Sequence, residues 1–161
     1  MHAWLKACKT IQRRSMQLTR YTDYGLRLLI YLALLPEGQR ASIDEISETY
    51  DISRNNLNKV VHHLGKEGVI ATKRGKGGGF CLNVAPQSIN LGEVVVLLEN
   101  TLQVVDCQSP ACCIQPACSL KGILQQATTA FIDTLKQYTL ADLIEPQQQE
   151  LITLLDISIE S

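Results

Sequence analysis

Residues 42–84 read SIDEISETYDISRNNLNKVVHHLGKEGVIATKRGKGGGFCLNV, and this stretch decides the fold. Ser42 is followed three residues later by Glu45, which is the spacing of a capping box and predicts the start of a helix. After a tight turn, Ser53 opens a second helix that we expect to end near Gly68. Two short helices separated by a tight turn are typical of a helix-turn-helix.

Two β-prone segments follow this pair of helices, at residues 69–73 and 80–84. The connection between them, RGKGGG at residues 74–79, is basic and rich in glycine. Strand-forming residues on both sides of such a tip predict a β-hairpin. A helix-turn-helix followed by a basic hairpin is a winged helix. We therefore expect a mainly α fold, a winged helix-turn-helix with a small β-hairpin wing.

Three further helices are expected outside this stretch. The first covers about residues 21–35, with Thr22 as its cap, and a short one covers about residues 91–99. The last is a long amphipathic helix that Ser119 caps and that runs to about Tyr138. Its apolar stripe consists of Leu120, Ile123, Leu124, Ala127, Ala130, Phe131, Thr134, Leu135 and Tyr138.

This long helix lies beyond the winged helix, so its apolar stripe needs a partner. A second copy of the same helix would supply one and would give a homodimer, although the stripe can also pack on its own domain. Four segments are predicted. They are an N-terminal extension at 1–15, expected to be disordered or to precede a true start at Met16; a DNA-binding domain at 16–87; a cluster-binding loop and dimerisation helix at 88–145; and a weakly ordered tail at 146–161.

The charge of the chain is distributed unevenly. The net charge is −1, yet residues 1–86 hold 13 Lys or Arg against 7 Asp or Glu, while the remainder holds 2 against 9. A basic half is typical of a chain that meets a polyanion, although clustering on solvated faces gives the same count. No apolar stretch is long enough to span a membrane, and no secretory signal is recognisable, so we expect a cytoplasmic protein.

Polar side chains dominate the second helix of the helix-turn-helix. Arginine pairs well with guanine and asparagine with adenine in the major groove, whereas Ser and Lys suit phosphates. We expect Arg54, Asn55 and Asn58 to contact bases. The wing cations would reach the DNA backbone or the minor groove. The full predicted DNA-binding set is Ser53, Arg54, Asn55, Asn56, Asn58, Lys59, Lys73, Arg74 and Lys76. The alternative is a polar solvated helix face beside a flexible hairpin.

Four cysteines, Cys107, Cys112, Cys113 and Cys118, fall within twelve residues of an irregular loop. Thiolates so concentrated favour a soft metal, and their spacing is wider than that of most structural zinc sites. An iron–sulfur cluster tolerates it. Spacing alone leaves open a cluster, zinc, thiol-redox chemistry or free cysteines. Cys81 lies in a predicted strand, where cysteine is most often a small buried hydrophobe.

Several motifs resemble those of the Rrf-type winged-helix repressors, and most closely the nitric-oxide-sensing members of that family. The similarity covers about residues 16–145. The motifs are LT-x-x-TDYGLR at 18–27, the wing at 74–79, the cysteine frame ending in Pro116-Ala117-Cys118, and YTLADL at 138–143. The resemblance implies a homodimer that binds palindromic double-stranded operator DNA, with nitric oxide as its effector.

The resemblance also implies a ligand set. It assigns Cys107, Cys112 and Cys118 to one iron–sulfur cluster per subunit, 4Fe–4S or 2Fe–2S, and leaves Cys113 as a non-ligand. It offers Asp23, reaching across from the other subunit, as a remaining ligand; the plain alternative is a helix-capping acid. The iron–sulfur-biogenesis regulator of the family has a His after its third cysteine, and none follows Cys118 here. The extra residues 1–15 and Cys113 depart from the family pattern.

The hypothesis is therefore a repressor that releases operator DNA when its cluster is nitrosylated. The alternatives are an iron- or redox-responsive regulator of the same family, a zinc-stabilised DNA-binding module, and an electron-transfer protein. We do not expect an enzyme, because the sequence has no nucleophile–base constellation and its glycine tract is not followed by the helix that a phosphate loop needs.

Overall fold

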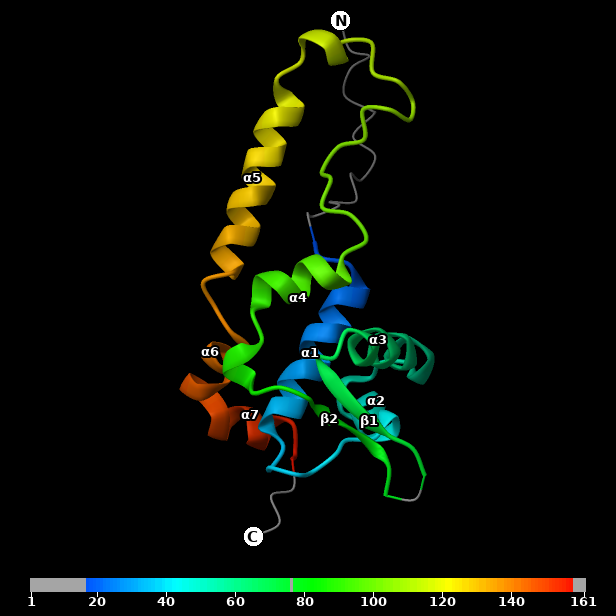
Figure 1. Ribbon diagram of the computed structural model, residues 1–161, viewed down its shortest axis with the longest axis vertical. Coiled ribbons are helices and arrows are strands. Elements are labelled where there is room, and N and C mark those ends of the chain that lie inside the picture. The colour runs from blue at the N-terminus through cyan, green and yellow to red at the C-terminus, as the bar shows by residue number, and fades with distance from the viewer. Residues whose placement is uncertain (1–16, 76, 158–161) are drawn as a thin grey trace, which may run out of the picture.

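Helix α1 (Arg20–Leu34) is the central element of the computed structural model, which describes residues 17–75 and 77–157 (Figure 1). The elements that contact it are α3 (Arg54–Lys66), α4 (Leu91–Leu98), α6 (Leu140–Ile144), α7 (Gln148–Leu154) and β2 (Gly79–Leu82). It is consequently buried on several sides rather than along one stripe. Its buried residues are Thr22, Gly25, Leu28, Leu29, Tyr31, Leu32 and Leu34.

The helix-turn-helix forms as predicted, from α2 (Ile43–Tyr50) and α3 (Arg54–Lys66). Ser42 and Glu45 form the capping box. The turn between the helices places Asp51 in the left-handed region, at φ 51°, and Ser53 caps α3 through a hydrogen bond from the backbone of Asn56. The inner face of α3 is buried core, made of Leu57, Val60, Val61 and Leu64.

The wing is the antiparallel pair β1 (Ile70–Lys73) and β2 (Gly79–Leu82), with Ile70 opposite Leu82 and Lys73 opposite Gly79. Phe80 also pairs with Ala41 ahead of α2, through two backbone hydrogen bonds of 2.9 Å, which fixes the wing to the body. Gly79 has φ +142°, and a Cβ there would lie 2.5 Å from the carbonyl oxygen of Ala41. Only glycine fits at this crossing.

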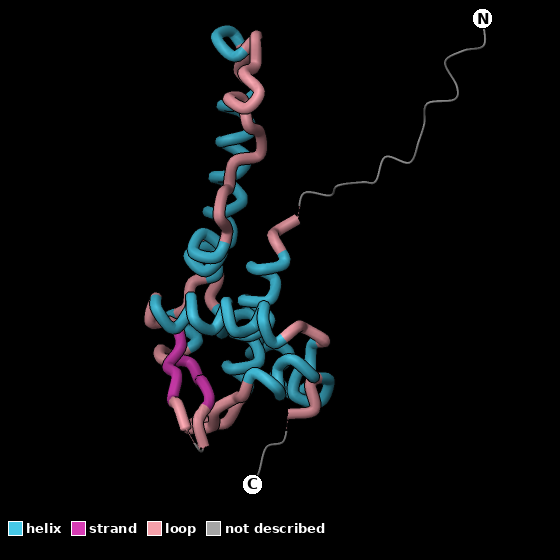
Figure 2. The backbone as a smooth tube through the Cα atoms, turned by 90° about the vertical axis from the view of Figure 1, so that its right-hand side faces the viewer, coloured by secondary structure: helices cyan, strands magenta, loops and turns pink. Residues whose placement is uncertain are grey.

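A long arm projects from this body (Figures 1 and 2). After the 3₁₀ turn η1 (Pro86–Ser88) and helix α4 (Leu91–Leu98), an irregular loop with one further 3₁₀ turn, η2 (Gln115–Ala117), leads to α5 (Leu120–Leu135). Ser119 occupies the N-cap position of α5 without a side-chain capping bond. The helix ends at Leu135, three residues before the predicted end. The carbonyls of Lys136 and Tyr138, just beyond it, accept hydrogen bonds from the side chain of Asn90 and the backbone of Leu91.

The C-terminal segment is where the sequence interpretation was wrong. In place of the weakly ordered tail expected at 146–161, the 3₁₀ turn η3 (Glu145–Gln147), which follows α6 (Leu140–Ile144), leads into α7 (Gln148–Leu154). Ile152 and Ile157 are only 8% and 7% exposed and belong to the main core, and α7 contacts α1. Burial against α1 orders a segment whose own sequence pattern is weak.

The cap of α1 also differs from the prediction. Thr19, not Thr22, is the N-cap, and its hydroxyl accepts a hydrogen bond from the backbone of Thr22. Thr22 itself is fully buried inside the first turn. The predicted extension at 1–15 and the alternative start at Met16 lie outside the described residues, and the division into domains stays a prediction. In the ranges 17–75 and 77–157, no helix has the length and apolar character that crossing a membrane requires.

Candidate nucleic-acid interface and cysteine loop

The solvent face of α3 gathers most of the side chains predicted to read DNA. Asn55, Asn58 and Lys59 are exposed, as are Ser53 at the cap and Arg54 at the first helical position. Asn56 is half-buried, because it lies closer to the core face of the helix. The helix thus presents amide, guanidinium and ammonium groups outward, the groups that pair with base edges and phosphates.

Arg54 has a protein partner that sequence reasoning did not find. Its Nε lies 2.9 Å from Oδ1 of Asp44 on α2, and the two side chains remain 63% and 62% exposed. Asp44 lies ten positions away in the chain, on the other helix of the motif. The tight turn between the helices is what brings the two charges together.

Three cations are predicted in the wing, and the structure describes two of them. Lys73 ends β1 and Arg74 follows it, and both are exposed. Lys76 lies outside the described residues. The tip is tight: a Cβ on Gly78 would lie 2.5 Å from the carbonyl oxygen of Lys73. A narrow tip with exposed cations fits contact with a phosphate backbone.

Tyr21, in the first turn of α1, is joined to α3. Its hydroxyl donates to the backbone carbonyl of Lys59 at 3.2 Å and lies 3.1 Å from Nδ1 of His63. The two rings are stacked, with centroids 6.0 Å apart. Burial raises the pKa of Tyr21 above its usual value, so the phenol keeps its proton. Because that single proton goes to Lys59, the phenol oxygen is free to accept from the imidazole.

The first turn of α1 is joined to α4 as well. Glu99, the residue that ends α4, accepts hydrogen bonds from the backbone N–H and the hydroxyl of Thr19 at 2.7 and 3.1 Å. Gly25 completes the contact, since a Cβ there would lie 2.3 Å from the side chain of Leu98. The start of α1 is therefore held where the cysteine loop begins.

Asp23 lies in the same first turn and is half-buried. Its Oδ1 accepts a hydrogen bond of 3.0 Å from Nε of Arg27, one helical turn further on. It also lines a surface hollow together with Gln17, Leu18, Arg20 and Leu26. Its carboxylate is thus accessible, and one ion pair holds it within its own helix.

The cysteine loop does not bring its thiols together as a metal site in the described residues. Cys107, Cys112 and Cys118 are half-buried, whereas Cys113 is exposed. The backbone N–H of Cys112 donates to the carbonyl of Cys107 at 3.1 Å. Over the part of the chain that the structure describes, no three Cys, His, Asp or Glu side chains converge as metal ligands.

The chemistry of this donor set nevertheless fits an iron–sulfur cluster. Three partly covered thiols on one loop are the ligands that such a cluster takes. The exposed thiol is that of Cys113, which the family resemblance does not assign as a cluster ligand. The metal assignment of Cys107, Cys112, Cys118 and Asp23 stays a prediction. Cys81, half-buried in β2, is less covered than expected of a core cysteine, and Cys8 lies outside the described residues.

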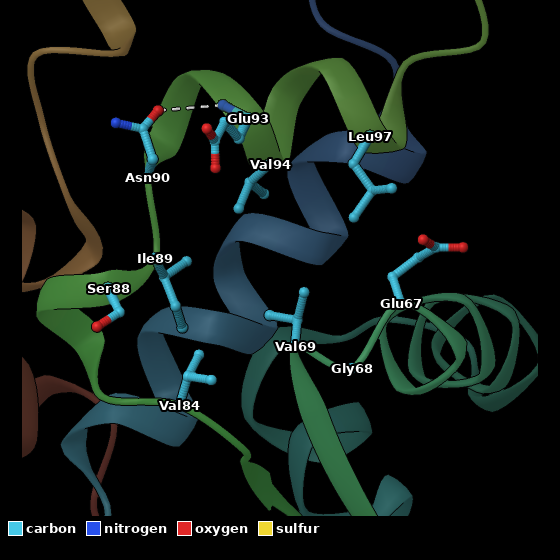
Figure 3. A pocket seen from close by; sticks show the side chains of 10 residues that line it. All are labelled: Glu67, Gly68, Val69, Val84, Ser88, Ile89, Asn90, Glu93, Val94 and Leu97. Atoms are coloured by element: carbon cyan, nitrogen blue, oxygen red, sulfur yellow. Dashed lines mark hydrogen bonds between the residues drawn. The ribbon is translucent and has the colours of Figure 1, made fainter.

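A separate pocket lies between α4, the C-terminal end of α3 and the base of the wing (Figure 3). Val94 and Leu97 point into it from α4, and Val69 and Ile89 face them, with Glu67 at its edge. No cysteine and no predicted DNA contact is among its lining residues. It therefore adds nothing to either candidate site.

Comparison with known proteins is consistent with this geometry. Residues 18–146 match the family model Rrf2, described as an iron-dependent transcriptional regulator. The chain is 48% identical to the HTH-type transcriptional regulator NsrR of Shouchella clausii, over 80% of this chain and 89% of that protein. It is 46% identical to the protein of the same name from Halalkalibacterium halodurans, over 86% and 99%.

Solved structures share the fold. CymR, the global cysteine regulator of B. subtilis, superimposes with a TM-score of 0.65 at 25% identity, over 80% of this chain and 96% of that one. The IscR of T. potens superimposes with a TM-score of 0.67 at 20% identity, over 91% and 95%, and at that identity shows the fold alone. With the family model covering nearly all of the described residues, this chain belongs to the Rrf2 family of winged-helix transcriptional regulators.

Proposed function

We propose that this protein is a homodimeric repressor that binds operator DNA and releases it in response to nitric oxide, through an iron–sulfur cluster held by the cysteine loop. The observation that carries the proposal is the position of α1. Its first turn contacts the end of α4, where the cysteine loop starts, through Glu99, and contacts the DNA-reading helix α3 through Tyr21.

The DNA-binding half uses the exposed face of α3 and the wing. Arg54, Asn55 and Asn58 contact bases, and Ser53, Asn56 and Lys59 support them from the same helix. The wing cations contact the sugar–phosphate backbone or the minor groove. Such contacts release counterions, so we expect binding to weaken steeply as salt rises.

The dimer forms through α5. Four large apolar residues of its predicted stripe and the turn that follows are exposed in the single chain: Leu120 at 51%, Ile123 at 58%, Phe131 at 41% and Tyr138 at 49%. Only Ile132 of the helix is buried. An apolar face left open on a projecting helix fits a second copy of that helix, and a two-fold dimer matches a palindromic operator.

The cluster ligands are Cys107, Cys112 and Cys118, with Asp23 of the partner subunit as the remaining candidate. When bound, the cluster supplies iron to which nitric oxide can bind. The carboxylate of Asp23 is held by Arg27 at 3.0 Å within its own helix. Asp23 is therefore able to exchange between that ion pair and a ligand position without unfolding α1.

The path from the loop to the DNA then runs through this chain's own contacts. A change in the loop acts on Glu99, which holds the N-cap of α1. The close packing of Gly25 on Leu98 prevents α1 and α4 from sliding independently. The hydroxyl of Tyr21 then passes the displacement to the middle of α3. The recognition helices of the two subunits lose their spacing, and affinity for the operator falls.

One anaerobic titration tests this proposal. Protein prepared without oxygen is mixed with operator DNA, and visible absorption and DNA binding are followed together as nitric oxide is added. We expect a coloured protein whose absorption and DNA affinity fall in parallel. A Cys112→Ala variant is expected to lose both the colour and the response, whereas Cys113→Ala keeps both.

The other readings predict different results. A colourless, zinc-containing protein that binds DNA regardless of nitric oxide would indicate a zinc-stabilised module. A coloured protein that ignores nitric oxide but responds to iron supply or oxidants would indicate an iron- or redox-responsive regulator. A coloured protein that binds no DNA at low salt would favour electron transfer.

A further inference from the structure

The side chain of Arg54 is held near its inner end by Asp44. The contact joins Nε of the guanidinium to Oδ1 of the carboxylate at 2.9 Å, across the turn of the helix-turn-helix. Both side chains are nearly two-thirds exposed, at 63% and 62%. An ion pair this exposed contributes little to folding stability. Its effect is therefore expected in the bound complex rather than in the free protein.

The chemistry of the guanidinium indicates what the pair does there. Arginine reads guanine by donating two hydrogen bonds to O6 and N7, and the terminal Nη1 and Nη2 groups form one edge suited to this. A carboxylate at Nε occupies a different donor and leaves that terminal edge for a base. It also restricts a long side chain before DNA arrives, which lowers the entropic cost of ordering the chain on binding.

We propose that Asp44 is a specificity-determining residue that presents Arg54 to a guanine in each operator half-site. The inference rests on the proposed DNA-binding function, because it requires α3 to be the recognition helix. With another base at that position, Arg54 has to leave Asp44 to find acceptors. The carboxylate is then desolvated beside DNA without a partner, which penalises the wrong sequence.

The chain offers a matched control on the same helix. Glu48 is exposed and is one helical turn beyond Asp44. Among the ion pairs of residues 17–75 and 77–157, none involves Glu48. Replacing either acid by its amide removes one negative charge near the DNA, but only Asp44→Asn removes the charge that faces Arg54 and so breaks the ion pair. Glu45 is unsuitable as a control, because its carboxylate bonds to Tyr31 and to the backbone of Ser42.

The test begins with an operator selected from a random DNA pool by the anaerobically prepared wild-type protein. Each base pair of one half-site is then changed, and the affinities of wild type, Asp44→Asn, Glu48→Gln, Arg54→Ala and the Asp44→Asn/Arg54→Ala double variant are measured at fixed salt. We expect Asp44→Asn to lose about tenfold in discrimination at one G·C pair and nowhere else, the scale of one bidentate contact. In the Arg54→Ala background, Asp44→Asn is expected to have no further effect on discrimination.

Two results would overturn the inference, and they differ from each other. If Asp44→Asn and Glu48→Gln both raise affinity for every sequence and leave discrimination unchanged, Asp44 acts only as a negative charge. If the wild type enriches no sequence from the pool, the DNA-binding function itself fails and the role of Asp44 falls with it. Thermal unfolding of each variant verifies that the fold is retained, as expected for exposed positions.

Discussion

The carboxylate of Glu99 caps a helix that begins eighty residues earlier in the chain. Its Oε1 accepts hydrogen bonds from the backbone N–H of Thr19 at 2.7 Å and from the Thr19 hydroxyl at 3.1 Å. Thr19 in turn caps α1 through the backbone of Thr22. One acidic side chain thus couples the end of α4, where the cysteine loop starts, to the N-terminus of the central helix. A negative charge is also favourable at that helix end.

Replacing Glu99 by Ala should weaken this coupling. We expect the variant to lose about 1 kcal/mol of unfolding free energy, the usual scale of a partly exposed hydrogen bond. More specifically, the ratio of operator affinities with and without the cluster should shrink. Binding titrations of cluster-loaded and cluster-free protein measure that ratio.

Glu93→Ala is the matched control for this experiment. Glu93 is an exposed acid on the same helix, and only its backbone N–H takes part in the cap of α4. It should leave the ratio unchanged. If Glu99→Ala kept the wild-type ratio while the wild type itself responds to the cluster, another contact would have to carry the signal.

Tyr21→Phe tests the contact between α1 and α3, which lies at the other end of the proposed path from Glu99 to the DNA. The change removes the hydroxyl that reaches Lys59 and His63 but keeps the ring and its stacking. Loss of these two hydrogen bonds is worth about 2 kcal/mol, or about thirtyfold in affinity if all of it appears in operator binding. Gel-shift or fluorescence titration at fixed salt measures the effect. Tyr24→Phe, on the same turn of α1, should change operator affinity much less.

Dimerisation through α5 is tested by the oligomeric state of the protein rather than by its operator affinity alone. Ile123 is 58% exposed in the single chain, so Ile123→Glu should not unfold it but should place a charge in the proposed interface. We expect monomers in sedimentation analysis and loss of operator binding. Gln126→Glu, on the polar face of the same helix, adds the same charge and should stay dimeric. A monomeric wild type would refute the interface outright.

Local sequence patterns predicted the elements whose start and stop signals lie close together in the chain. The capping box at Ser42, the start of α3 at Ser53 and the hairpin on either side of the glycine tract all formed as expected. In each case the residues that predict the element lie close in the sequence to the element itself. The nine residues predicted to bind DNA lie on or beside these same elements, except for Lys76, which is outside the described residues.

The contacts that link the two candidate sites gave no such signal. Thr19 meets Glu99, and Tyr21 meets Lys59 and His63, only because α1 packs between α3 and α4. Helical periodicity indicates which face of α1 is apolar, but not which neighbours will cover it. The pairing of Arg54 with Asp44 likewise depends on the angle between two helices, which a sequence pattern does not specify.

Helix α7 is the clearest case of tertiary contacts overriding a weak local pattern, and it gives the last prediction. Ile152 is 8% exposed and belongs to the core cluster that includes α1, whereas Leu154, two residues on, is 73% exposed. Ile152→Ala should cost about 2 kcal/mol of unfolding free energy, at the low end for a buried aliphatic side chain because it lies near the chain end. Leu154→Ala should stay within about 0.5 kcal/mol of wild type. Chemical denaturation of both variants measures the difference. Equal effects from the two substitutions would mean that α7 does not pack on α1 in solution, and that residues after Pro146 are the loose tail that the sequence alone suggested.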